Sequence, residues 1–217
     1  MVYIIKYIQV NKKRGSKYME RKQAKDLLDF IYDSPTAFHA VETVKKILDE
    51  NGFKEIKESD KWDLKSRDKY YVIKNDSSIM AFVVGDENIE ETGLRLIGAH
   101  TDAPGFRVKP NPQMISEEKY VKLNTEMYGG PIISTWYDRP LALAGKVAIK
   151  GVSPLKPETR LVNMNKPIMI IPNIAIHMNR EVNDGYKYNK QVDTLPLLGL
   201  INEKLENKDY LMDILAA

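Results

Sequence analysis

The sequence predicts a mixed α/β fold that is followed by a β-rich module. Two stretches, roughly residues 20–32 and 38–48, repeat apolar residues at helical spacing. Two β-rich segments then flank the turn sequence Asn-Asp-Ser-Ser at residues 75–78, and Leu94–Ala99 forms a short apolar run. Helices, a hairpin and a buried strand together indicate a mixed sheet with helices packed on it.

The two helices are bounded by clear local signals. Ser-Pro-Thr at residues 34–36 ends the first helix and starts the second, because proline stops a helix but is tolerated near its start. Asn51 and Gly52 form a C-cap pair at the end of the second helix. His39 falls in the first turn of that helix. It is interpreted as a surface residue rather than a metal ligand, because no partner ligand stands at a suitable spacing.

The second half of the chain is rich in short β-type runs separated by prolines and glycines. Pro110 and Pro112 mark the expected domain boundary after Lys109. The expected strands are Tyr120–Leu123, Ile132–Tyr137, Leu143–Ile149, Arg160–Val162, Ile168–Ile171 and Ile174–Met178. Leu195–Leu205 and Tyr210–Ala217 return to helical spacing. The expected organisation is therefore a doubtful extension (residues 1–18), an α/β part (19–109) and a β-rich part that returns toward helix (110–217).

The first 18 residues allow two interpretations. Met19 directly precedes a helix start, so it is a candidate initiator, and residues 1–18 would then lie upstream of the protein. Alternatively, the apolar run Val2–Val10 forms a short extra strand. Basic residues follow this run, whereas in a secretory signal they precede the apolar core, so export is not expected and a cytoplasmic location is.

Composition excludes several classes of protein. The chain has 217 residues, is 43% hydrophobic and contains no cysteine, so it has neither a disulfide framework nor a thiolate zinc site. The net charge is +3, but the first 30 residues hold eight basic and three acidic side chains, which leaves −2 for the remainder. Such a basic terminus is typical of a solvated tail, and no nucleic-acid partner is expected. No apolar stretch approaches the length of a membrane span.

The strongest local chemical signal is His100 followed by Asp102, at the end of the apolar run Leu94–Ala99. One imidazole nitrogen can bind a metal ion while the other donates to an acceptor that fixes the ring, and Asp102 could supply that acceptor. The alternative is a purely structural loop, in which Asp102 caps backbone N–H groups beside a neutral histidine. A zinc site needs three or four ligands. The candidate partners of His100 are Asp138, His177, Asp184 and Asp193.

Two further features favour structural interpretations. Asp138 and Arg139 are read as a salt-bridged pair on spacing alone. His177 lies in an alternating, strand-like run, where a polar residue usually faces solvent. The chain contains no G-x-S-x-G and no phosphate-binding glycine motif, so neither an α/β serine hydrolase nor a nucleotide-binding loop is supported.

Five collinear segments nevertheless resemble one family, the M18 metallopeptidases or aspartyl aminopeptidases. The segments are SPTAFHA at 34–40, GAHTDAPG at 98–105, EMYGG at 126–130, STWYDRPL at 134–141 and IAIHMNR at 174–180. The likeness extends from about residue 20 to residue 217. It implies a zinc-exopeptidase-like α/β catalytic domain, present here in part, with an inserted β-rich domain used for oligomerisation.

The resemblance also implies an activity and a site. The activity would be removal of N-terminal residues, preferably acidic ones, from peptides by a metal-activated water. The centre would hold two metal ions, usually Zn²⁺. His100 corresponds to a metal-ligand histidine and Asp102 to the carboxylate that orients it. His177 corresponds to a histidine of the insert, which either binds metal or reaches a neighbouring subunit's site and contacts substrate there.

The chain departs from the family pattern in one respect. Family members are much longer, and their bridging aspartate, general-base glutamate and remaining ligands lie in a C-terminal part. We therefore expect this chain to be an N-terminal portion that is poorly stable or inactive alone. The alternative from another class is a non-catalytic assembly or binding protein that keeps the β-rich module. A self-sufficient short peptidase built on His100, His177 and a carboxylate is the least favoured hypothesis.

Overall fold

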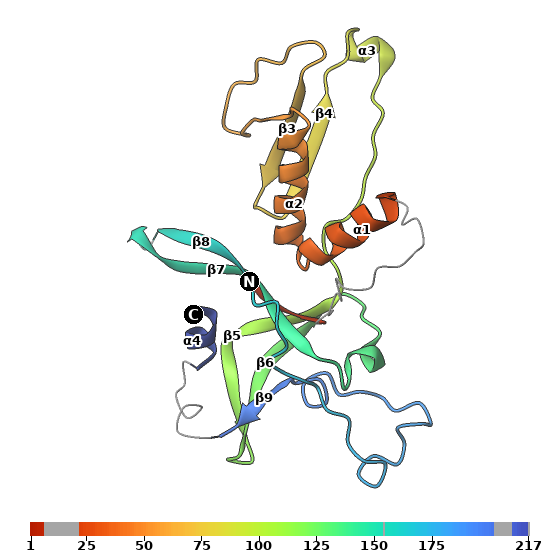
Figure 1. The fold of residues 1–217 in the computed structure, drawn as a ribbon, viewed down its shortest axis with the longest axis vertical. Helices are drawn as coiled ribbons and strands as arrows, with labels where there is room; N and C mark the ends of the chain where they lie inside the picture. Colours follow the sequence, from red (N-terminus) through yellow and green to blue (C-terminus); the bar gives the residue numbers. More distant parts are fainter. Residues whose placement is uncertain (7–21, 154, 202–209, 217) are drawn as a thin grey trace. The chain divides into compact units, whose positions relative to one another are not determined.

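The computed structural model describes residues 1–6, 22–153, 155–201 and 210–216. They form two compact units (Figure 1), one of Arg14–Ala103 and the other of Met1–Lys13 with Pro104–Ala217. The expected boundary after Lys109 falls inside a strand of the second unit. None of the described helices has the length and apolar character that crossing a bilayer requires.

The first unit is a small mixed sheet with two main helices. Its elements are α1 (Lys22–Asp33), α2 (Ala37–Glu50), β2 (Lys54–Glu55), β3 (Lys69–Lys74), β4 (Ser78–Val83) and the short α3 (Ile89–Thr92). The strand order is β2-β3-β4, with β2 parallel and β4 antiparallel to β3. Helix α2 lies against this sheet (Figure 1) and buries Phe38, Ala40 and Val41. The predicted mixed α/β character of this region is confirmed.

The predicted boundaries of α2 are confirmed. Thr36 has extended backbone angles, and its hydroxyl oxygen accepts from the backbone N–H of His39 at 3.5 Å. This is the N-cap arrangement that satisfies one of the free N–H groups at a helix start. At the other end Asn51 closes the helix, and Gly52 adopts a left-handed φ of 77°. Glycine suits that position because it carries no Cβ.

The predicted hairpin is also confirmed. Asn75 and Asp76 both have positive φ angles, 53° and 58°, between β3 and β4. Positive φ at both central residues is the geometry of a tight hairpin turn whose twist matches that of the strands. The antiparallel ladder places Tyr71 opposite Ala81. Tyr71 is fully buried, so the hairpin supplies the centre of this unit's core.

The second unit is a six-stranded antiparallel sheet in the order β8-β7-β1-β5-β6-β9. Its elements are β1 (Val2–Lys6), β5 (Gly105–Ser116), β6 (Tyr120–Tyr128), the 3₁₀ helix η1 (Ile133–Trp136), β7 (Leu141–Ser153), β8 (Lys156–Asn163), β9 (Leu197–Leu200) and α4 (Tyr210–Ala216). Its core contains residues from the sheet, from η1 and from α4. The core residues are Ile4, Phe106, Leu123, Trp136, Leu141, Leu143, Met169, Ile171 and Leu211.

The strand predicted over Leu94–Ala99 is not present. These residues form no regular element, and Leu96 and Ile97 are 87% and 97% exposed. An isolated strand cannot satisfy its own backbone hydrogen bonds, so it persists only when paired with a neighbour. No strand of the described chain pairs with this run. The apolar sequence alone therefore did not determine a buried strand.

Three further segments differ from the prediction. Ile132–Tyr137 contains the 3₁₀ helix η1, in which the Thr135 hydroxyl donates to the carbonyl of Ile132 at 2.8 Å. Ile174–Met178 is a turn rather than a strand, since the N–H of Met178 donates back to the carbonyl of Ala175 at 2.8 Å. Leu197–Leu200 is a strand paired with β6 instead of helix, because Pro196 precedes it and a partner edge is available.

The run Ile168–Ile171, predicted as a strand, forms only isolated bridges through Met169, Ile170 and Ile171. Other predictions agree with the structure where it describes the chain. The short β-type runs around residues 120, 145 and 161 lie in β6, β7 and β8, and the C-terminal helix is α4. Of the two interpretations of the first residues, the strand is the one seen, over Val2–Lys6. Met19 lies outside the described residues.

Candidate metal-binding loop and histidine-bearing loop

His100 lies in an extended loop of the first unit, and its side chain is 81% exposed. Its Nδ1 stands 2.7 Å from the backbone carbonyl oxygen of Asp102 and 3.2 Å from Oδ1 of the same residue. Both partners are acceptors, so Nδ1 is the nitrogen that donates to them. The predicted pairing of His100 with Asp102 is present, and the backbone carbonyl shares the role given to the carboxylate.

The loop is tied to the hairpin next to the histidine. The hydroxyl of Thr101 donates to the backbone carbonyl of Ser77 at 2.7 Å. Ser77 belongs to the turn between β3 and β4, which is itself fixed by the ladder of those strands. The position of His100 therefore depends on the turn sequence that the hairpin requires.

His177 lies in the second unit, on a long loop between Ile171 and β9. It is exposed, and so are its apolar neighbours Ile176 and Met178, at 50% and 76%. The turn that carries it closes through the hydrogen bond from Met178 to Ala175. An exposed histidine among exposed apolar side chains is typical of a loop tip that meets another surface.

Asp138 anchors the beginning of this loop. It has a positive φ of 53° and follows the buried Trp136 by two residues. Its two carboxylate oxygens accept from the backbone N–H and the side-chain amide of Asn173, at 3.0 and 2.8 Å. These hydrogen bonds lower the pKa of Asp138. No ion pair between Asp138 and Arg139 is found in the described residues, so the predicted salt-bridged pair is wrong.

Asp193 anchors the end of the loop. Its Oδ2 accepts from the hydroxyl of Tyr186 and from the backbone N–H of Asn189, each at 2.7 Å. Its backbone carbonyl accepts from the hydroxyl of Tyr137 at 2.8 Å. Burial, followed by the nearby charge of Asp193, raises the pKa of Tyr137. Asp193 thus has a structural role that the spacing of histidines and carboxylates did not reveal.

The described residues do not assemble a complete metal site. They contain no group of three or more histidine and carboxylate side chains placed to share an ion. His100 and Asp102 belong to one compact unit, while His177 and the candidate carboxylates Asp138 and Asp193 belong to the other. The donor set of His100 fits one ligand position, because an oriented imidazole with an open Nε2 is what a divalent metal requires.

His39 lies in the first turn of α2, as the sequence suggested, but it is half-buried and not the surface residue that was predicted. Its Nδ1 lies 2.8 Å from the hydroxyl of Thr36 at the start of α2. The ring is partly buried, and burial lowers its pKa. Neither observation indicates a metal ligand, so His39 serves as a reference histidine for experiments.

The second unit also contains an open cavity of about 460 Å³. Its lining residues are Asp138, Pro140, Pro167, Ile168, Met169, Ile170, Leu197, Leu198 and Gly199. The lining is mostly apolar and holds no histidine. Asp138 is one of the lining residues, and its carboxylate already accepts hydrogen bonds from Asn173. The cavity therefore has no ligand set for a metal ion.

Comparisons with known proteins identify the family and the fold of the chain. A family model described as Aminopeptidase I zinc metalloprotease (M18) matches residues 30–213. The Clostridium novyi protein named Probable M18 family aminopeptidase 2 is 63% identical over 195 residues, which are 90% of this chain and 45% of that protein. The mApe1 structure from Chaetomium thermophilum has a TM-score of 0.74 and 32% identity, over 85% of this chain and 41% of that one.

A third relative is the S. cerevisiae mApe1 dodecamer, with a TM-score of 0.68 and 27% identity over 85% of this chain and 40% of that one. The fold is thus that of a zinc metallopeptidase class. The chain belongs to the M18 family of aminopeptidases, as its motifs indicated. It spans less than half the length of the relatives it matches.

Proposed function

We propose that the protein acts in metal-dependent removal of N-terminal residues, preferably acidic ones, from peptides. The observation that carries the proposal is the pairing of His100 Nδ1 with Asp102, which leaves Nε2 as the nitrogen that would bind a metal. Membership of the M18 family supports the reaction class. The proposal concerns the whole protein, of which these residues supply the first histidine ligand.

The metal is proposed to be Zn²⁺, with two ions in a complete site. Bound zinc would supply a Lewis acid for the scissile carbonyl and would lower the pKa of a bound water. The chain's own contribution is to hold His100. Asp102 keeps the Nδ1 proton in place, and the Thr101–Ser77 hydrogen bond fixes the loop. An acceptor on Nδ1 also raises the basicity of the ligating nitrogen.

His177 is proposed to complete the site from the exposed loop, either as a metal ligand or as a substrate contact from a neighbouring subunit. Support for a role at a surface comes from the exposure of the loop tip and from its anchors at Asp138 and Asp193. The two roles differ in a measurable way. Loss of a ligand lowers the metal content, whereas loss of a substrate contact raises KM and leaves the metal in place.

The protein is further proposed to be a cytoplasmic homo-oligomer that assembles through the inserted β-rich domain. The related mApe1 of S. cerevisiae forms a dodecamer. The second unit has a core of its own, so it can present a surface without help from the first unit. Peptides are the proposed partners of the active site.

The test measures zinc content and peptidase activity in the same preparations. The purified protein is stripped with a chelator, reloaded with Zn²⁺ and assayed on peptides beginning with Glu or Asp. His100→Ala is expected to lower the zinc content and to abolish activity, whereas Asp102→Asn is expected to weaken zinc binding by about 10–100-fold. His39→Ala is the control and should change neither measurement.

Two outcomes would contradict the proposal. Full activity after rigorous chelation would exclude a metal-dependent reaction. Unchanged zinc content in His100→Ala would exclude His100 as a ligand. A stable, zinc-free oligomer of the whole protein without peptidase activity would instead establish the non-catalytic assembly function.

A further inference from the structure

Strand β1 occupies an interior position in the six-stranded sheet. It pairs antiparallel with β7 at five positions, from Val2 opposite Gly145 to Lys6 opposite Leu141. On its other side it pairs with β5, with Tyr3 opposite Arg107 and Ile4 opposite Phe106. Strand β1 therefore lies between β5 and β7 in the sheet, although it precedes β5 by about a hundred residues in the sequence.

The contact between β1 and its neighbours is part of the core. Ile4 is 1% exposed and lies between Phe106 on β5 and Leu143 on β7, which are both fully buried. Without β1, the facing edges of β5 and β7 would expose unpaired N–H and C=O groups. Two facing strand edges with unpaired backbone groups readily bind an added strand.

The gap between β5 and β7 is the space in the sheet that β1 fills. On the β7 side of this gap, the backbone of β1 comes unusually close to β7. A Cβ built on Gly145 would lie 2.6 Å from the Cα of Val2, closer than real Cβ contacts allow. Ala142 and Ala144, the neighbouring residues of β7, are fully buried and small. Gly145 therefore allows the backbone of β1 to approach, whereas a larger residue at this position would displace it.

On the β5 side of the gap, Arg107 makes contacts that favour an aromatic residue in the inserted strand. The guanidinium of Arg107 lies 4.2 Å from the ring of Tyr128 and 5.6 Å from the ring of Tyr3. Nε of Arg107 also donates to the Tyr3 hydroxyl at 3.3 Å. Cation–π contacts of this kind favour an aromatic side chain at the position of Tyr3.

We propose that the gap between β5 and β7 is a strand-binding site whose occupant is the segment Val2–Lys6, and that the same segment of a second copy of the chain can take its place. The site recognises an extended peptide with an aromatic residue facing Arg107 and an aliphatic residue facing Phe106. Fifteen residues, 7–21, separate β1 from α1 in the sequence. A strand from another molecule would make the same contacts, because the site is formed entirely by residues remote in sequence.

A disulfide experiment tests both the position and the exchange of β1. The chain has no cysteine, so introduced cysteines report on one pair alone. Tyr3 and Ala144 face each other in the ladder, so the double variant Tyr3→Cys with Ala144→Cys is expected to cross-link within one molecule on mild oxidation. Tyr3→Cys with Ala148→Cys is the matched control and should not cross-link, because Ala148 lies four residues further along β7, beyond the residues 141–145 that pair with β1.

Exchange is measured by mixing two single variants, Tyr3→Cys and Ala144→Cys. A covalent heterodimer is expected after incubation, and adding Gly145→Val to the acceptor should lower its yield at least tenfold. Absence of the cross-link in the double variant would overturn the strand-binding site. A cross-link in the double variant without a heterodimer in the mixture would overturn the exchange.

A peptide experiment provides an independent measurement. A labelled peptide with the sequence of residues 1–6 is added to the wild-type chain and to the Ile4→Asp chain, in which the resident strand loses its core contact. The Ile4→Asp chain is expected to bind the peptide at least tenfold more tightly, and a peptide carrying Asp at position 4 should not bind. Equal binding of the two peptides would contradict the proposal. The cross-linking mixture still decides the matter if Ile4→Asp fails to fold.

Discussion

The carboxylate of Asp138 holds Asn173 by two hydrogen bonds, one to its backbone N–H at 3.0 Å and one to its side-chain amide at 2.8 Å. This pair joins the segment after η1 to the start of the loop that carries His177. Because the donors stabilise the ionised carboxylate, the pKa of Asp138 is lowered on folding.

The first prediction concerns the pH dependence of that contact. A carboxyl whose pKa is lowered in the folded state contributes stability above its unfolded pKa, about 3.9, and loses that contribution as the pH falls through the folded value. Asp138→Asn is therefore expected to lower the melting temperature at pH 7, with a difference that shrinks toward pH 3. Thermal unfolding at pH 7, 5 and 3 measures this. Asp184→Asn, in the same loop, is the control, and a pH-independent difference would contradict the assignment.

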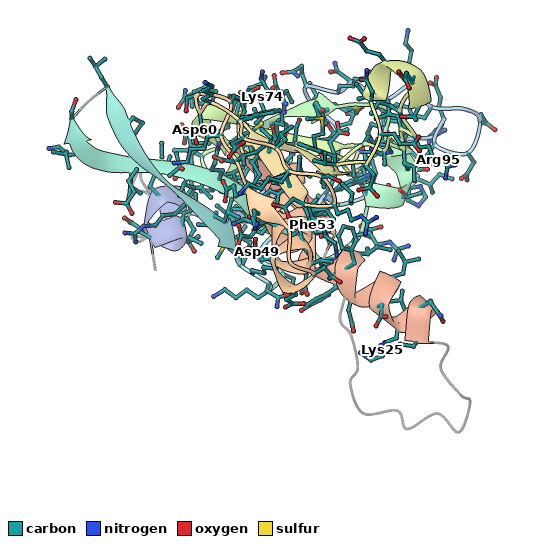
Figure 2. All side chains as sticks on the ribbon, turned by 90° about the horizontal axis from the view of Figure 1, so that it is seen from above. Lys25, Asp49, Phe53, Asp60, Lys74 and Arg95 are labelled. Carbon is teal, nitrogen blue, oxygen red and sulfur yellow. The ribbon has the colours of Figure 1, made fainter. Side chains whose placement is uncertain are left out.

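The second prediction concerns Tyr71 in the first unit. Its buried hydroxyl donates to Oδ1 of Asp49 at 2.7 Å and accepts from Nζ of Lys45 at 2.5 Å. Asp49, labelled in Figure 2, lies near the end of α2. Tyr71→Phe is expected to lower the free energy of unfolding by about 1–2 kcal/mol, because two hydrogen bonds to charged groups are lost. Urea denaturation measures the change.

Tyr120→Phe provides the comparison for Tyr71, because Tyr120 is 37% exposed. Loss of the Tyr120 hydroxyl should change the unfolding free energy by less than about 0.5 kcal/mol. Equal effects of the two substitutions would show that the network linking α2 with β3 contributes nothing measurable.

The third prediction concerns the core of the second unit. Phe106 is fully buried and meets Trp136 edge to face, with the ring centroids 5.0 Å apart. Phe106→Ala is expected to cost about 3–5 kcal/mol through lost burial and the cavity left behind. Ile115→Ala is a matched control on the same strand, where the side chain is 60% exposed, and should cost little. Similar midpoints in denaturant for the two variants would argue against the observed facing of β5.

The fourth prediction concerns the hairpin turn. Asp76 has a φ of 58°, a conformation that costs most side chains about 1–2 kcal/mol. Asp76→Gly is therefore expected to preserve or raise the melting temperature, while Asp76→Val should lower it because β-branched residues tolerate positive φ poorly. If glycine destabilised as much as valine, the turn geometry would be wrong.

Local signals explain which elements could be predicted from the sequence. The start of α2 at Thr36 and the turn at Asn75 and Asp76 depend on side chains within four residues, so the sequence contains all the information they need. The pairing of His100 with Asp102 is also local, since a single residue separates them in the chain.

Distant pairings explain the failures. The position of β1 depends on Gly145 and Arg107, which no local pattern connects to Val2 and Tyr3. Leu197–Leu200 carries apolar residues compatible with helix, and only the free edge of β6 makes it a strand. The anchoring of the His177 loop by Asp193 depends on Tyr186 and on the fold around it, so the carboxylate was considered as a ligand instead.

The exposed run Leu94–Ala99 has a consequence for the histidine that follows it. On the proposed assignment, an ion bound to His100 gains affinity from every contact that orders the backbone before the ligand. Ordering of this run and capture of the ion at His100 are, on that assignment, thermodynamically coupled. By reciprocity, any contact that ordered Leu96 and Ile97 would tighten ion binding by the same factor by which the ion would favour that contact.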